Sequence, residues 1–250
     1  MMRLNLSSSL ETLENFNSDD FDVTTLLKLT NLRKLTACIR SGKFQDLKAI
    51  IQCLSITLNH LRHTSLDVTN YTFCSEEELT LLKQMLGCHL LYELMIKGVI
   101  GMLPEYCHFS PSLTVLTLKE SELTEDPMAT LEKLPNLRSL FLWKDSFVGK
   151  EMVSSAMGFP KLTSLTFWGL SNLDKRRVDE EAMPNLLYLQ IGDWANLKMV
   201  PYGLRFVTTL QKLVISYMPE AFKNRLRVID GEEGEDFYKV RHVPSVTYYD

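Results

Sequence analysis

The chain has 250 residues, of which 45% are hydrophobic and 23% are charged. This composition predicts an ordered protein with a substantial buried core. Its 27 Lys and Arg residues against 31 Asp and Glu residues give a formal net charge of −4, so the chain lacks the basic excess that binding along a nucleic acid backbone requires. We therefore expect no nucleic-acid partner.

The N-terminal segment and the cysteines indicate an intracellular, reduced protein. Residues 1–9 contain no apolar run of the length of a signal peptide, and no segment is long enough to span a membrane. Five cysteines with no CxxC spacing predict neither a disulfide framework nor a zinc site. We expect a cytoplasmic location and mostly buried thiols at Cys38, Cys53, Cys74, Cys88 and Cys107.

The first ninety residues carry an irregular leucine repeat. Its members recur at intervals of 22 to 31 residues, at Leu13, Leu32/Leu35, Leu66/Val68 and Leu91/Leu94/Ile96, where Leu66 is taken as the equivalent of Leu94. Two helices are predicted between these positions. One covers 46–54, with Leu47, Ile50, Ile51 and Leu54 on one face, and the other covers 75–86 and opens with a capping box of Ser75 and Glu78.

From about residue 90 to 216 the repeat is regular. The pattern LxxLxL has first positions 24 or 25 residues apart, at Leu113/Leu116/Leu118, Leu137/Leu140/Leu142, Leu162/Leu165/Phe167, Leu186/Leu189/Ile191 and Leu210/Leu213/Ile215. A proline stands two residues before the first leucine at Pro111, Pro135, Pro160 and Pro184. This period is typical of leucine-rich repeats, and each Leu-x-Leu predicts a short strand with one buried face.

The predicted fold is α/β, a leucine-rich-repeat solenoid or horseshoe with a parallel concave β-sheet and an irregular, short-helical convex side. About nine repeats form a single domain over residues 1–250. On the convex side, Asp126-Pro127 with Met128, Leu131 and Leu134 predicts a short helix. Residues 217–250 leave the repeat, and we expect them to form the C-terminal cap that covers the last core layer.

No motif predicts catalysis or a cofactor. GxxxxGK[ST], GxSxG, HExxH and DxDxDG are all absent from the sequence. Cys88-His89 and Cys107-His108 are neighbours that would point to opposite faces of a strand, and such pairs rarely share a metal ion. We therefore predict that the chain is not an enzyme and has no catalytic, cofactor-binding or metal-binding residues.

The residues beside the repeat leucines point away from the core, so successive repeats stack them in columns on the concave face. One column contains Phe141 and another contains Trp143 and Trp168, which are large rings that the core does not require. The alternative is that the two indoles pack against each other or beneath a loop. The residues predicted to bind a protein partner are Lys119, Phe141, Trp143, Trp168, Tyr188, Gln190 and Lys212.

Several segments of the sequence carry a family resemblance. They are Leu29-Thr-Asn-Leu-Arg-Lys-Leu35, Asp126-Pro-Met128, Gly158-Phe-Pro160, Ala182-Met-Pro-Asn-Leu186 and the ending Asp236-Phe-Tyr-Lys-Val-Arg-His-Val-Pro-Ser-Val246. With them, nearly the whole chain resembles the C-terminal leucine-rich-repeat domain of plant intracellular disease-resistance proteins of the coiled-coil, nucleotide-binding class, near the RPP13-like group. The coiled-coil and nucleotide-binding domains of that family have no counterpart in these residues.

The resemblance implies a recognition and regulatory module of plant immunity. Its protein partner would be a pathogen effector, a host protein that an effector modifies, or the nucleotide-binding domain of a resistance protein, which such a module holds inactive. The alternative is a general intracellular scaffold or substrate-adaptor domain outside immunity.

Overall fold

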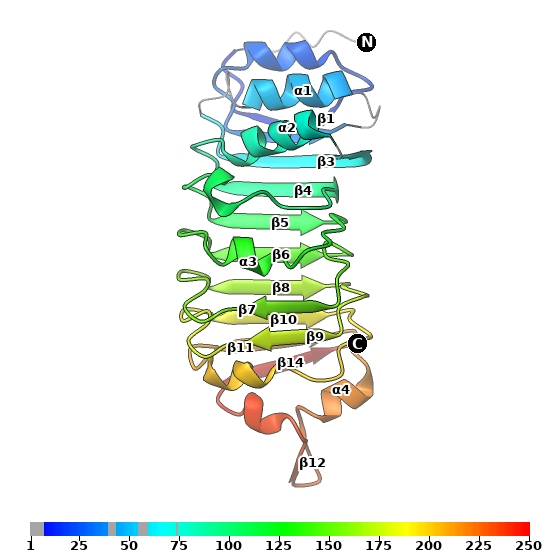
Figure 1. Cartoon of the computed structure of the whole chain (residues 1–250), viewed down its shortest axis with the longest axis vertical. Coiled ribbons are helices and arrows are strands. Elements are labelled where there is room, and N and C mark those ends of the chain that lie inside the picture. Colours follow the sequence, from blue (N-terminus) through cyan, green and yellow to red (C-terminus); the bar gives the residue numbers. More distant parts are fainter. Residues whose placement is uncertain (1–7, 40–43, 55–59, 74) are drawn as a thin grey trace. The chain divides into compact units, whose positions relative to one another are not determined.

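The computed structural model describes residues 8–39, 44–54, 60–73 and 75–250. The chain divides into two compact units, unit 1 ending at Ser121 and unit 2 beginning at Glu122. In each unit a parallel sheet forms one layer, and short helices, small strands and irregular segments return the chain between its strands (Figure 1). Both units therefore consist of stacked strand-and-return repeats.

Unit 1 contains a parallel sheet whose strands are paired in chain order. The strands are β1 (Thr12–Asn17), β2 (Lys34–Cys38), β3 (His63–Thr72), β4 (Glu93–Val99) and β5 (Val115–Lys119). The returning segments contain η1 (Val23–Lys28), α1 (Phe44–Gln52), α2 (Glu76–Leu86) and η3 (Tyr106–His108). The alternating burial of β4 and β5 shows that one face of the sheet covers the core.

Both helices predicted in unit 1 are confirmed. α1 buries Leu47, Ile50 and Ile51. At the start of α2, the Glu78 backbone N–H donates to Ser75 Oγ at 3.2 Å, and the Ser75 N–H donates to Glu78 Oε2 at 2.7 Å. This reciprocal pair is the predicted capping box, and it satisfies two of the backbone donors that a helix start leaves without a partner.

The register predicted for the third repeat is wrong by two residues. β3 pairs Leu66 with Ile96 and Thr64 with Leu94, so Thr64 occupies the position that leucine takes in the neighbouring repeats. Thr64 is 3% exposed, and among the described residues its Oγ1 has no hydrogen-bond partner. The strand itself was predicted from Leu66 and Val68, but its register could not be read from a leucine pattern because a β-branched threonine, whose shape suits a strand, fills the buried position.

In unit 2 the main strands are also parallel, and a smaller sheet lies in the returning segments. The main strands are β6 (Ser139–Trp143), β8 (Ser164–Trp168), β10 (Tyr188–Gly192), β11 (Lys212–Ser216) and β14 (Ser245–Tyr249). The smaller sheet pairs β7 (Glu151–Ser154) with β9 (Lys175–Val178), where the sequence predicted irregular or helical structure. The core lies between these layers, since the Arg176 guanidinium of β9 lies 5.3 Å from the ring centroid of Phe167 in β8.

Short helices complete the returning segments of unit 2. They are α3 (Met128–Leu131), η4 (Tyr202–Phe206), α4 (Glu220–Asn224) and η5 (Phe237–Lys239). α3 is the helix that the sequence predicted near Asp126, whose Oδ1 accepts a hydrogen bond from the Met128 N–H at 2.9 Å. The other Asp126 oxygen accepts from the Val153 N–H at 2.8 Å, so this one carboxylate joins α3 to β7.

The C-terminal tail adds a strand to the sheet of unit 2. After α4 and a hairpin of β12 (Val228–Ile229) and β13 (Glu232–Glu233), the chain forms β14, which pairs with β11 and aligns Val246 with Leu213. Val243, Val246 and Tyr248 have the spacing of the repeat leucines. This strand was not predicted because it carries no leucine and follows a longer returning segment. The tail therefore combines a further repeat strand with covering segments.

The prediction that the cysteines are mostly buried is wrong for the described thiols. Cys53 alone among these is buried, Cys38 and Cys88 are half-buried, and Cys107 is exposed. Burial raises the pKa of the Cys53 thiol to about 12 and that of the Cys88 thiol to about 11. Cys74 lies outside the described residues.

The capping box yields a stability prediction. We expect Ser75→Ala to lower the free energy of unfolding of unit 1 by about 1 kcal/mol, because the Glu78 N–H loses its acceptor at the helix start. Ser75→Asp keeps an acceptor at the same position and should change stability little. Urea unfolding and amide exchange of α2 measure both variants; equal losses in both would contradict the assigned role of the cap.

Candidate binding face

The residues that flank the buried leucines form the open face of each sheet, which is turned away from the leucine core. In unit 2 the predicted columns on this face are confirmed. The register aligns Phe141 with Thr166 and Trp143 with Trp168, and it continues from Trp168 to Gly192 and Ser216. Parallel pairing thus brings side chains that are 24 or 25 residues apart in the sequence onto neighbouring strands.

Trp143 and Trp168 stack, with ring centroids 5.8 Å apart and an angle of 21° between the ring planes. The two indoles therefore do pack against each other, as the alternative prediction held, and both remain partly exposed. Beyond Trp168 the column continues with Gly192, where an added Cβ would lie 2.6 Å from Trp168 Cε3. The absence of a side chain at Gly192 is what allows the Trp168 ring to extend over β10.

Tyr217 is a further aromatic residue of this face, which the sequence analysis missed. Its ring meets Trp168 edge-on, with centroids 5.6 Å apart, and the residue is 60% exposed. Tyr217 directly follows β11 and has a left-handed backbone, with φ of 51°. The residues that directly follow β6, β8 and β10 are left-handed too; they are Lys144, Gly169 and Asp193. The sequence signal for Tyr217 is therefore its position directly after a repeat strand, and the predicted columns contained only residues within the strands. Trp143, Trp168 and Tyr217 are called the aromatic cluster below.

The remaining predicted residues of unit 2 lie beside the aromatic cluster on the same face. The Tyr188 hydroxyl donates to Gln190 Oε1 at 3.0 Å, so these two side chains bond to each other. Partial burial, with a smaller contribution from Tyr249, raises the pKa of Tyr188. Lys212 aligns with Tyr188 across the sheet and is exposed. Tyr249, 52% exposed, aligns with Ser216 and belongs to the tryptophan column, although the sequence analysis did not include it.

Lys119, the other predicted residue, lies in β5 of unit 1, where it aligns with Lys97 of β4. The open face of unit 1 carries several ion pairs. Lys97 Nζ lies 3.0 Å from Asp67 Oδ2, and Lys34 Nζ lies 2.6 Å from Glu14 Oε1. Such partly exposed ion pairs contribute little to stability. Breaking one of them to form an ion pair with a binding partner would therefore cost little free energy.

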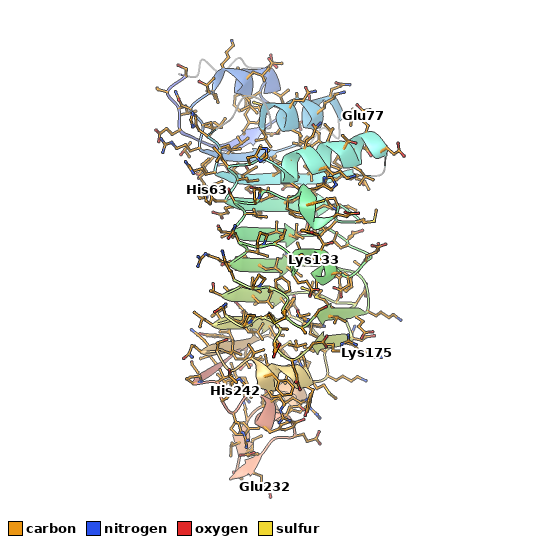
Figure 2. All side chains as sticks on the ribbon, turned by 60° about the vertical axis from the view of Figure 1, so that its left-hand side comes forward. His63, Glu77, Lys133, Lys175, Glu232 and His242 are labelled. Carbon is orange, nitrogen blue, oxygen red and sulfur yellow. The ribbon has the colours of Figure 1, made fainter. Side chains whose placement is uncertain are left out.

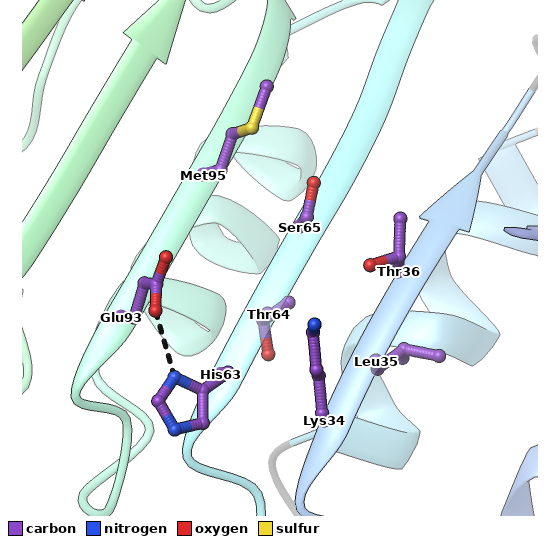
Figure 3. A pocket seen from close by; sticks show the side chains of 8 residues that line it. All are labelled: Lys34, Leu35, Thr36, His63, Thr64, Ser65, Glu93 and Met95. Atoms are coloured by element: carbon purple, nitrogen blue, oxygen red, sulfur yellow. Dashed lines mark hydrogen bonds and ion pairs between the residues drawn. The ribbon is translucent and has the colours of Figure 1, made fainter. Parts of the chain in front are cut away.

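A hollow of about 350 Å³ lies on the open face of unit 1 (Figure 3). Its lining combines short hydroxyl side chains with longer ones at the rim, where His63 Nδ1 lies 2.9 Å from Glu93 Oε2. Thr36 and Ser65 leave the space between Lys34 and Met95 open. The lining residues are Lys34, Leu35, Thr36, His63, Thr64, Ser65, Glu93 and Met95.

Comparison with known proteins decides the family. The profile of the family described as "Leucine-rich repeat region" matches residues 3–227. The chain belongs to the leucine-rich-repeat family. A solved structure with a similar fold, the crystal structure of a TLR13–ssRNA13 complex, has a TM-score of 0.55 and 17% sequence identity, and the match covers 99% of this chain and 38% of that one. At this identity the likeness concerns the fold alone.

The relatives of this leucine-rich-repeat chain are plant disease resistance proteins. It is 38% identical over 239 residues to At1g59780 of Arabidopsis thaliana, whose name places it among disease resistance proteins, and 34% identical over 246 residues to the disease resistance protein RPP8 of the same plant. Both matches cover 96% of this chain and 24% or 25% of the relative. The chain thus spans about a quarter of the length of these relatives, and the resemblance seen in the sequence is confirmed.

Within the described part of this repeat chain, no three His, Cys, Asp or Glu side chains are grouped so that they could hold a metal ion. The same residues include no helix with the length and apolar character needed to cross a membrane.

Two tryptophans of unit 2 differ in the hydrogen bonding of their indole N–H groups, and this difference can be tested by substitution. Trp143 Nε1 is buried with no hydrogen-bond partner among the described residues, whereas Trp194 Nε1 donates to the Leu173 carbonyl at 2.5 Å. We expect Trp143→Phe to change the free energy of unfolding by less than about 1 kcal/mol, and Trp194→Phe to cost more, about 1–3 kcal/mol, because it leaves a buried carbonyl without its donor.

Chemical denaturation of both variants measures these costs. Equal losses of stability in the two variants would contradict the assignment of Trp143 as a ring whose N–H contributes no hydrogen bond to the fold. Tryptophan fluorescence provides a control, because either variant keeps two of the three indoles.

Proposed function

We propose that the chain is a protein-binding recognition module of plant intracellular immunity and that it binds its partner through the open face of unit 2. The observation that carries the proposal is the aromatic cluster, whose three rings are joined by contacts of 5.6 and 5.8 Å and remain partly exposed. The identity of the relatives supports the role in immunity, since they are disease resistance proteins.

The aromatic cluster has the physical properties of an energetic centre for binding. Aromatic side chains carry much apolar area on few rotatable bonds, and they dominate the binding energy of many protein interfaces. Here the stack and the edge-on contact hold Trp168 in place before a partner arrives, so little side-chain entropy is lost on binding. The fold does not require rings at these positions, because Ser216 occupies the same column on β11.

Polar groups around the cluster supply the rim that such an interface needs. Tyr188, Gln190 and Lys212 lie in the adjacent columns, and Phe141 lies two residues before Trp143 on the same strand and face. A rim of hydroxyl, amide and ammonium groups orients a partner and excludes water from the centre. The proposed contact set therefore consists of the aromatic cluster with Phe141, Tyr188, Gln190, Lys212 and Tyr249, and Lys119 is a separate candidate in unit 1.

The proposed partner is a protein of the plant cytoplasm: a pathogen effector, a host protein that an effector modifies, or the nucleotide-binding domain of a resistance protein. The relatives are about four times as long as this chain, so in them the matching region shares a polypeptide with other segments. An intramolecular partner of this kind binds at high effective concentration, which makes autoinhibition possible even with a modest interface.

Trp168→Ala tests the proposal. We expect it to weaken partner binding by about thirtyfold, which corresponds to about 2 kcal/mol, the loss typical of a residue at the centre of an interface. The fold should survive because the buried leucines remain. Tagged chains are incubated with leaf extract, retained proteins are quantified by mass spectrometry, and the affinity of each is then titrated with the purified protein.

Tyr238→Ala is the matched control, since Tyr238 is also a partly exposed aromatic residue of unit 2 with a ring neighbour, Tyr202, but lies in η5 rather than on the open face. It should retain the same proteins as the unaltered chain. If Trp168→Ala lowers the melting temperature while the affinity per folded molecule stays unchanged, the cluster is a packing feature and the proposal fails.

A further inference from the structure

A second concave site lies in unit 2, among the returning segments rather than on the open face. It is a pocket of about 650 Å³ between the start of β9, the segment 196–202 and η5. Figure 2 marks Lys175 on β9, where this pocket begins. The volume lies in the range of about 300–1,000 Å³ that is usual for small-molecule sites. The lining residues are Asp174, Lys175, Arg176, Asn196, Leu197, Lys198, Met199, Val200, Pro201, Tyr202 and Lys239.

The charge of this pocket is opposite in sign to that of the whole chain. Four lining residues are basic and one is acidic, whereas the chain carries a net charge of −4. Lys175 and Lys198 are exposed, so their ammonium groups are available at the mouth. A cleft in which one sign of charge dominates raises the local concentration of ligands of the other sign.

The base of the pocket holds a buried cation in a fixed position. Lys239 is 4% exposed, and its Nζ lies 2.7 Å from Asp236 Oδ1 and donates to the Val200 carbonyl at 3.1 Å. Asp236 also pairs with Arg225, whose Nε lies 2.7 Å from Asp236 Oδ2. Arg225 is also paired with Glu235, so two carboxylates face these two cations, and Lys239 is held in place as a charge-balanced part of the base of the pocket.

Arg176 adds a second buried cation beneath the pocket. Its guanidinium donates to the Arg177 carbonyl at 2.7 Å and to Ser154 Oγ at 2.6 Å, and it lies against the Phe167 ring. Burial lowers the pKa of Arg176 to about 10, with Asp126 and Glu132 opposing the shift, so the group stays charged at neutral pH. Its donors are used within the protein and the carboxylates of Asp126 and Glu132 offset its charge, so Arg176 forms part of the pocket wall and does not bind the ligand directly.

The other walls are apolar. Leu197, Val200 and Pro201 line the pocket together with Met199 and Tyr202, which are 49% and 55% exposed. The Tyr202 ring is held from outside the pocket by Arg205, whose guanidinium lies 5.0 Å from the ring centroid. Exposed apolar side chains beside ammonium groups fit a ligand that has an apolar body and a negatively charged group.

We propose that this pocket binds a small organic anion with a flat or aliphatic apolar body and a carboxylate, sulfonate or phosphate group. The apolar body lies against Leu197, Met199 and Tyr202, and the anionic group lies near the exposed Lys175 and Lys198. This site is independent of the aromatic cluster and of the protein partner proposed above.

Two fluorescent probes that differ by one charge test the proposal. Anilinonaphthalene sulfonate is an aromatic anion, and phenylnaphthylamine has the same ring system without the sulfonate. We expect Lys175→Gln and Lys198→Gln each to weaken binding of the sulfonate by about threefold and together by about tenfold, because pairs of exposed charges contribute modestly. Asp174→Asn should tighten it by about twofold. Binding of phenylnaphthylamine should change in none of these variants.

Location is checked by methyl NMR of methionine-labelled protein. The Met199 methyl resonance, assigned with Met199→Leu, should shift on titration with the sulfonate, and that of Met157, which is 70% exposed outside the pocket, should not. Lys83→Gln on α2 removes the same charge from unit 1 and should leave the affinity unchanged. The proposal is overturned if the lysine substitutions weaken binding of both probes equally, if Lys83→Gln weakens sulfonate binding as much as Lys198→Gln does, or if the Met199 methyl resonance does not shift.

Discussion

In-register pairing of parallel strands is the constraint on which both units depend. One repeat is too short to bury its own leucines, so each strand must present them in line with those of its neighbour. In unit 2 the register places Leu140, Leu165, Leu189 and Leu213 in one buried row. A slip of one residue would turn this row outward, so the hydrophobic effect itself fixes the pairing. Every column on the open face follows from that buried row.

Because the leucine core takes only alternate residues of each strand, the residues between them are free to differ from one repeat to the next. Unit 1 uses this freedom for paired charges such as Asp67 with Lys97, whereas unit 2 uses it for rings. The stack of Trp143 on Trp168 is a direct result of the register, and its extent depends on the missing side chain at Gly192. Recognition chemistry can therefore change by single substitutions without any change in the core.

The regular repeats could be predicted from the sequence because leucine marks both their core and their register. Leu140, Leu165 and Leu189 have the predicted spacing, and with them the alignment of Trp143 and Trp168 was predictable. The prediction fails where another residue replaces leucine, as Thr64 does in β3 and Val246 does in β14. It also fails at Tyr217, since a left-handed residue after a strand does not follow the strand's alternation. The pocket beside β9 could not be predicted, because it depends on Lys239, which lies far along the chain in the tail.

The C-terminal tail contributes residues to both proposed sites of unit 2, so both sites depend on its folding. It supplies Tyr217 and Tyr249 to the open face and Lys239 to the pocket. Its position is fixed by the pairing of β14 with β11, by the Tyr248 hydroxyl that donates to the Leu226 carbonyl at 3.1 Å, and by Arg227, which lies 4.1 Å from the Tyr248 ring centroid. The two sites face different layers and share no side chain. A substitution that loosens the tail would nevertheless weaken both, and variants of the individual rings or lysines are therefore needed to separate them.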